Sequence, residues 1–66
     1  MFKMRLKEVL KAKGVSQGQL SRGADISLQT VQRMCNDVGY VPNADTLAKT
    51  AKYLQVAVEE LYTYED

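Results

Sequence analysis

The fold of this chain is limited chiefly by short segments in which apolar residues recur at helical spacing. Each segment is bounded by a residue that starts or stops a helix. Near residues 2–13, apolar positions recur three or four apart among lysines, and Gly14 follows at a typical helix end. Ser16 begins a second, shorter segment, with Gln19 three residues on in a capping-box pattern. The apolar run 56–58 is too short for a convincing strand. The first part of the chain is therefore predicted to be two short helices.

Similar signals predict three more helices. Ser27 is a good N-cap for a third helix that ends near Asn36, and Asn43 for a fourth over the apolar positions of 44–54. A short fifth helix is expected over 58–62. Without internal repeats, the 66 residues are predicted to form a single all-α domain of five short helices, residues 1–66.

Composition excludes several classes of function. There is no histidine and only one cysteine, Cys35, which excludes an internal disulfide framework, the usual zinc sites and a Ser–His or Cys–His catalytic pair. No apolar run approaches the roughly 18 residues that cross a bilayer. We therefore expect a soluble, cytoplasmic, non-enzymatic domain with no metal, no cofactor, no membrane partner and no small-molecule site.

The net charge of +1 conceals an uneven distribution. Residues 1–33 carry seven cations and two anions, a net +5, whereas residues 34–66 carry two cations and six anions, a net −4. Three interpretations remain open: a polyanion bound by the first half, a head-to-tail assembly, or chance segregation on a solvated surface.

The second and third predicted helices have the spacing of a helix-turn-helix, at about residues 17–36. Gln17–Gly23 and Leu28–Asn36 are joined by about four residues, with a small residue before the joint. If Val31 of the second helix of the pair faces the core, its opposite face lies about 100–160° away. That face comprises Gln29, Gln32, Arg33 and Asn36. Paired amide and guanidinium groups match the edges of adenine and guanine, so this face predicts contact with DNA bases.

At these positions the chain resembles the lambda-repressor-like, Cro/Xre-type helix-turn-helix domains. The matching stretches are Leu6–Gln17, Gln19–Ser21, Ile26–Met34, Asn36, Pro42–Val56 and Glu59–Tyr62. The resemblance implies a five-helix domain that binds double-stranded DNA, usually as a transcriptional repressor. It also implies a homodimer, at least on DNA, and a pseudo-palindromic operator.

The resemblance implies roles for particular residues. Gln17 would bind phosphate, the start of the third helix would enter the major groove, and Asn36 would meet the DNA backbone. The complete predicted DNA-binding set is Ser16, Gln17, Ser27, Leu28, Gln29, Thr30, Gln32, Arg33 and Asn36.

The chain departs from the family pattern at four places. The loop 37–41 contains Asp37 and lacks the usual basic residue, which weakens its expected grip on phosphate. Asp25 replaces the usual glycine of the turn but tolerates a left-handed backbone. Leu28 either touches a thymine methyl group or flanks the core. Ala57 lacks the hydroxyl that often caps the fifth helix, so fraying is expected there.

Cys35 admits a redox-sensor hypothesis, with Arg33 lowering the pKa of the thiol, but its helical position favours burial. In the resembling family, the positions of Leu10 and Cys35 often hold an Arg–Glu pair. Both are apolar here, so we expect them to pack together, which avoids desolvating two charges.

A second class of function remains open: an antitoxin or protein-interaction module that keeps the helix-turn-helix fold. Dimerisation would have to use the domain itself. The apolar candidates for such an interface are Val56, Val58, Leu61, Tyr62 and Tyr64.

Overall fold

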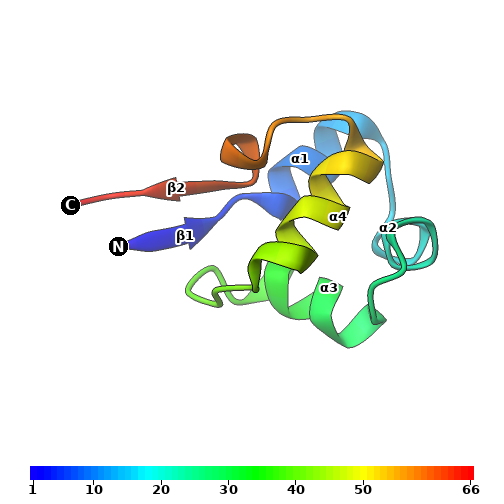
Figure 1. Cartoon of the computed structure of the whole chain (residues 1–66), viewed down its shortest axis with the longest axis horizontal. Coiled ribbons are helices and arrows are strands. Elements are labelled where there is room, and N and C mark those ends of the chain that lie inside the picture. Colours follow the sequence, from blue (N-terminus) through cyan, green and yellow to red (C-terminus); the bar gives the residue numbers. More distant parts are fainter.

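The computed structural model describes residues 1–66 and contains four α-helices, one 3-10 helix and a two-stranded sheet (Figure 1). In chain order the elements are β1 (Phe2–Met4), α1 (Leu6–Lys13), α2 (Gln17–Ala24), α3 (Leu28–Asn36), α4 (Ala44–Leu54), η1 (Val58–Leu61) and β2 (Tyr62–Tyr64). The four α-helices surround one apolar core, and the two strands extend from it together with both chain ends. None of the helices is long and apolar enough to span a membrane.

The prediction of an all-helical chain is wrong at both ends. The helix expected near 2–13 begins only at Leu6, because the preceding residues form β1, which pairs antiparallel with β2. Met4 lies opposite Tyr62, and the ring of Phe2 stacks on that of Tyr62 with centroids 5.0 Å apart. Aromatic and β-branched residues suit strands, and aromatic rings on diagonally related positions of a strand pair reach each other. The sheet therefore ties the two ends of the chain together.

The expected fifth helix is present only as the short 3-10 helix η1, so the structure has four α-helices where five helices were expected. Ala57 offers no side-chain oxygen to the first turn, as expected from its methyl group. Instead its backbone N–H donates to Oε2 of Glu60, at 2.8 Å. The chain then passes directly into β2, whose pairing with β1 requires an extended backbone at Tyr62. The element consequently stops after Leu61.

The predicted helix caps are confirmed. Ser16 and Gln19 form a reciprocal capping box at the start of α2. Asn43 Oδ1 accepts from the backbone N–H of Thr46 at the start of α4. Gly14 ends α1 with a φ of +68°, a left-handed backbone that glycine adopts without steric cost. These caps satisfy backbone groups that the helix ends would otherwise leave without a partner.

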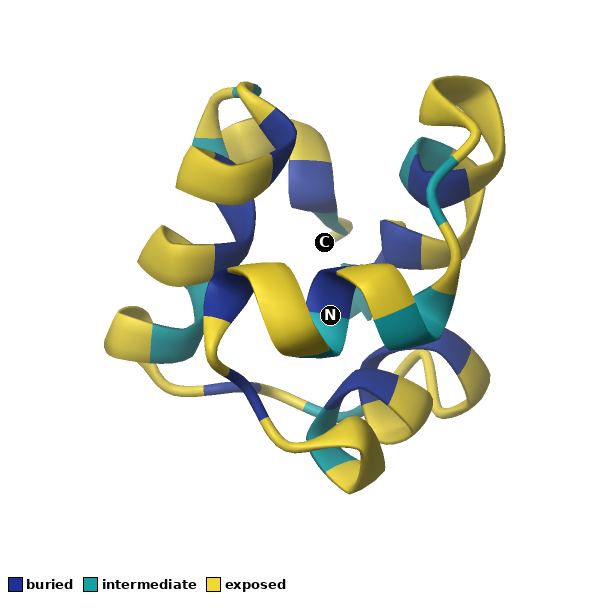
Figure 2. Ribbon diagram, turned by 90° about the vertical axis from the view of Figure 1, so that its right-hand side faces the viewer, coloured by how far each residue is buried: buried dark blue, intermediate teal, exposed yellow.

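The core is a single cluster of buried apolar residues to which every helix contributes. Figure 2 shows the buried residues of each helix as short dark-blue stretches between exposed ones. The side chains with almost no exposed surface are Leu6, Leu20, Val31, Met34, Thr50 and Leu61. Thr50 is the one polar member, and its hydroxyl donates to the carbonyl of Thr46 at 2.8 Å.

Cys35 belongs to this core. Cys35 and Leu10 are each 5% exposed and lie in the same cluster, which agrees with the expectation that they pack together. Burial raises the pKa of the Cys35 thiol, although the Lys7 charge and the neighbouring Gln17 side chain act in the opposite direction. A buried, protonated thiol is a poor nucleophile, so the structure favours a packing role over a redox sensor.

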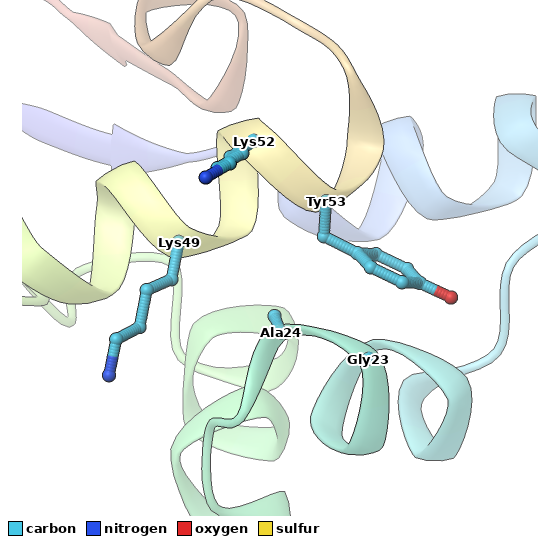
Figure 3. Close-up of a pocket in the computed structure, with 5 residues that line it drawn as sticks. All are labelled: Gly23, Ala24, Lys49, Lys52 and Tyr53. Carbon is cyan, nitrogen blue, oxygen red and sulfur yellow. The ribbon is translucent and has the colours of Figure 1, made fainter.

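Helices α2 and α4 approach each other closely at Gly23. The Tyr53 ring of α4 lies directly over Gly23, and a methyl group there would overlap the ring (Figure 3). Beside this contact, Lys49 and Lys52 extend from α4 along an open hollow whose other wall includes Ala24. Gly23, which lowers the helical propensity of α2, therefore makes room for an aromatic side chain.

Candidate nucleic-acid interface

The turn between α2 and α3 is fixed by hydrogen bonds and by one left-handed residue. Asp25 has a φ of +57°, as its place in the turn predicted. Ile26 is 9% exposed, and its backbone N–H donates to the carbonyl of Ser21 at 3.0 Å. The Ser21 hydroxyl donates to the carbonyl of Ile26 at 2.6 Å. Because two hydrogen bonds join Ser21 of α2 to Ile26 of the turn, α3 is held at a defined angle to α2.

Helix α3 has one buried and one exposed face, as its sequence predicted. Val31, Met34 and Cys35 are buried. The opposite face is exposed and comprises Gln29, Gln32, Arg33 and Asn36. None of these four side chains donates to or accepts from another group of the protein, so their hydrogen-bonding groups remain free for a ligand.

The hydroxyl groups of the predicted set are used within the protein. Ser27 Oγ accepts from the backbone N–H of Thr30 at 3.2 Å and donates to Thr30 Oγ1 at 2.8 Å. Ser16 Oγ accepts from the N–H of Gln19 at 3.1 Å. Within the protein, these side chains therefore serve as helix caps. Only the other N–H groups at the starts of α2 and α3, which the caps do not use, are suited to bind phosphate.

Two other predicted positions are placed more precisely by the structure. Leu28 is 46% exposed, so it extends from the start of α3 rather than filling the core, and the alternative of a core-flanking residue is not supported. Gln17 is half-buried, with its side chain beside Cys35.

One contact at this surface had no signal in the sequence. The guanidinium carbon of Arg33 lies over the ring of Tyr40, 4.5 Å from its centroid. Tyr40 lies in the loop between α3 and α4, where Asp37 Oδ1 accepts from the N–H of Gly39 at 3.2 Å. The carboxylate of Asp37 thus shapes the loop. A single aromatic residue in an irregular loop has no periodicity that would have indicated its neighbour.

The charges around α2 and α3 favour an anionic ligand. Within residues 16–36 the only acidic residue is Asp25, in the turn, against Arg22 and Arg33. Both salt bridges of the structure lie outside this segment. They are Lys3–Glu65 at 3.2 Å and Lys49–Asp45 at 3.3 Å. The two arginines are therefore not neutralised by carboxylates within the protein.

Two helices joined by a fixed turn, with a free polar face on the second, define a helix-turn-helix domain of the class that binds DNA. The comparison with protein families agrees: residues 5–66 match the model of the Cro/C1-type HTH DNA-binding domain. The chain belongs to this family. The expected relation to Cro/Xre-type domains is thereby confirmed.

A solved structure shows the same fold. The chain is similar to a protein from Bacteroides fragilis described as a "putative DNA-binding protein", with a TM-score of 0.83 and 30% sequence identity. The match covers 96% of this chain and 100% of that one. No curated protein matches the sequence.

Proposed function

We propose that this protein binds double-stranded DNA sequence-specifically and regulates transcription as a repressor, with α3 in the major groove. The observation that carries the proposal is the exposed face of α3, whose amide and guanidinium groups have no partner within the protein. Membership of a DNA-binding family supports it. The proposal places the protein in the cytoplasm, with its DNA.

The proposed contacts divide into base and phosphate contacts. The side-chain amides of Gln29 and Gln32 match the hydrogen-bonding edge of adenine, and the guanidinium of Arg33 matches that of guanine. The exposed Leu28 can make an apolar contact with a thymine methyl group. The phosphate contacts comprise Gln17, Asn36 and the backbone N–H groups beside Ser16 and the Ser27–Thr30 cap. The base contacts supply specificity, and the phosphate contacts fix the position of α3.

We also propose that two copies bind a pseudo-palindromic site, because helix-turn-helix domains usually occupy half-sites about one helical turn apart. Among the apolar candidates for a dimer interface, Leu61 is buried in the core and only Tyr64, 70% exposed, lies mostly in solvent. Dimerisation is therefore proposed to occur chiefly on DNA. Sedimentation should show mainly monomer without DNA and two copies on a selected duplex, and a strict one-to-one complex on every site would contradict this.

The experiment that tests the function is selection of bound sites from a random duplex library. We expect enrichment of a two-fold symmetric sequence, bound at least about 10³-fold more tightly than a scrambled duplex at physiological salt. Circular dichroism of the same sample provides the control for folding. A folded protein that enriches no sequence would contradict the proposal.

A protein-interaction module is the second candidate, and the loop after α3 favours it. Val38 and Val41 are 54% and 62% exposed, and the loop between them carries no cation. Retention of duplex DNA on a filter at low salt separates the two functions. Retention supports the DNA-binding proposal, and its absence supports the module.

A further inference from the structure

We infer that Tyr40 is a positioning residue that holds the Arg33 guanidinium in place for contact with a guanine, and so helps to determine the DNA sequence that the protein prefers. This inference rests on the proposed function, in which α3 enters the major groove. It assigns a specificity role to the loop between α3 and α4, although that loop lacks the basic residue expected to bind phosphate.

The first support is the way Arg33 is engaged. Its guanidinium carbon lies 4.5 Å from the centroid of the Tyr40 ring, well within the range of a cation–π contact. No carboxylate or carbonyl group of the protein accepts a hydrogen bond from it. The aromatic ring therefore restrains the side chain while its N–H donors remain available for the two acceptors of a guanine.

The second support is that the ring is itself fixed. The backbone N–H of Tyr40 donates to the carbonyl of Asp37 at 2.9 Å, and the ring packs against the core. The same loop is fastened to the sheet, since the N–H of Met4 donates to the carbonyl of Val38 at 2.9 Å. Tyr40 is thus a fixed support for a side chain that would otherwise sample many rotamers.

Restraint of the Arg33 side chain by Tyr40 before DNA is bound is expected to favour binding. A free arginine side chain loses considerable conformational entropy when it is fixed against a base, and a restraint present before binding reduces that loss. Asp37 contributes indirectly, because its carboxylate accepts from the N–H of Gly39 and helps to set the course of the loop before Tyr40. If the stack instead withheld Arg33 from DNA, removing the ring would strengthen binding.

The test measures base discrimination on a selected duplex in which each base pair is replaced in turn. Arg33→Ala identifies the guanine concerned, at which discrimination should fall about 5- to 150-fold. At the same base pair Tyr40→Leu should reduce discrimination about two- to fivefold, with little effect on a scrambled duplex. Tyr40→Phe is the matched control and should behave as the wild type, because it keeps the ring. In an Arg33→Ala background, Tyr40→Leu should cause no further loss.

Several results would overturn the inference. They are unchanged or improved discrimination in folded Tyr40→Leu, an equal loss in Tyr40→Phe, or a loss that persists without Arg33. If Tyr40→Leu is unstable, Tyr40→Met serves as a second variant without an aromatic ring. A measurement without any substitution is NMR of the wild type: ring-current shifts of the Arg33 side-chain protons should be present free and on DNA, and their absence in either state contradicts the inference.

Failure of the inference is distinguishable from failure of the proposed function. If Arg33→Ala loses discrimination and Tyr40→Leu does not, only the role of Tyr40 is wrong. If the wild type prefers no sequence, the proposed function is wrong. If Arg33→Ala leaves discrimination unchanged, only the contact of Arg33 with guanine is wrong, and the role of Tyr40 falls with it.

Discussion

At position 35, a cysteine stands where the resembling family often places a carboxylate paired with an arginine at position 10. Cys35 and Leu10 are both buried here, so two apolar side chains occupy the place of an ion pair. Replacing a buried ion pair with apolar packing is often neutral or stabilising, whereas a single buried charge without its partner is strongly destabilising. The chain thus depends on both positions being apolar together.

We predict that Cys35→Glu lowers the free energy of unfolding by about 3–5 kcal/mol, because it places an unpaired charge in the core. Adding Leu10→Arg should recover part of this loss, and urea denaturation of the four proteins in a double-mutant cycle measures the coupling. Additive losses would contradict the proposed packing. As a check on burial, a thiol reagent should label native Cys35 slowly and the unfolded chain rapidly.

Features of single residues were predictable where their cause is local. The caps at Ser16, Ser27 and Asn43 could be predicted because each forms with a backbone group three residues away. The exposed face of α3 followed from the 3.6-residue period alone. The stack of Arg33 on Tyr40 could not be predicted, because it depends on the course of an irregular loop.

Between elements, the packing of α2 on α4 explains why Gly23, a residue with low helix propensity, lies within α2. Tyr53 lies over Gly23, so the helices meet at a point where no side chain fits. Gly18, in the same helix, has no such neighbour. A Cβ there would lie 3.4 Å from Nη1 of Arg22, the mobile end of a long side chain. The same substitution at Gly18 and Gly23 therefore compares a position without a close aromatic neighbour with one that has it.

We predict that Gly23→Ala destabilises the protein by about 1–3 kcal/mol, since displacing the ring outweighs the better helix propensity of alanine. Gly18→Ala, the control, should raise stability by up to about 1 kcal/mol. Thermal unfolding of both variants gives the comparison, and truncating Tyr53 to alanine should relieve the cost at position 23. Equal stabilisation by the two substitutions would show that the contact with Tyr53 is not limiting.

The two strands are the elements that could not be predicted from the sequence. Phe2–Met4 and Tyr62–Tyr64 are only three residues each, too short for a periodic pattern to distinguish them from helix. Their strand character comes from pairing across the full length of the chain, which no local window contains.

For the whole molecule, the charge distribution predicts how strongly salt weakens binding. Lys3 and Lys49 are engaged by carboxylates, whereas Arg22 of α2 and Arg33 of α3 have no carboxylate partner and are available for DNA. If roughly four to six phosphates are neutralised per dimer, the slope of log K against log salt concentration should be about −4 to −5. Fluorescence anisotropy of a labelled duplex over a salt series measures it, and an affinity independent of salt would be incompatible with DNA binding.

In the proposed complex, the exposed face of α3 contacts bases, whereas the start of α2 contacts phosphate. The most direct measurement is the affinity of Gln29→Ala and Gln17→Ala for the preferred duplex and for a scrambled one. Gln29→Ala should lose about 1–3 kcal/mol of binding free energy on the preferred duplex and much less on the scrambled one. Gln17→Ala should weaken both by similar factors, because phosphate contacts carry no base information. Equal losses on both duplexes for Gln29→Ala would contradict the assignment of α3 as the base-contacting helix.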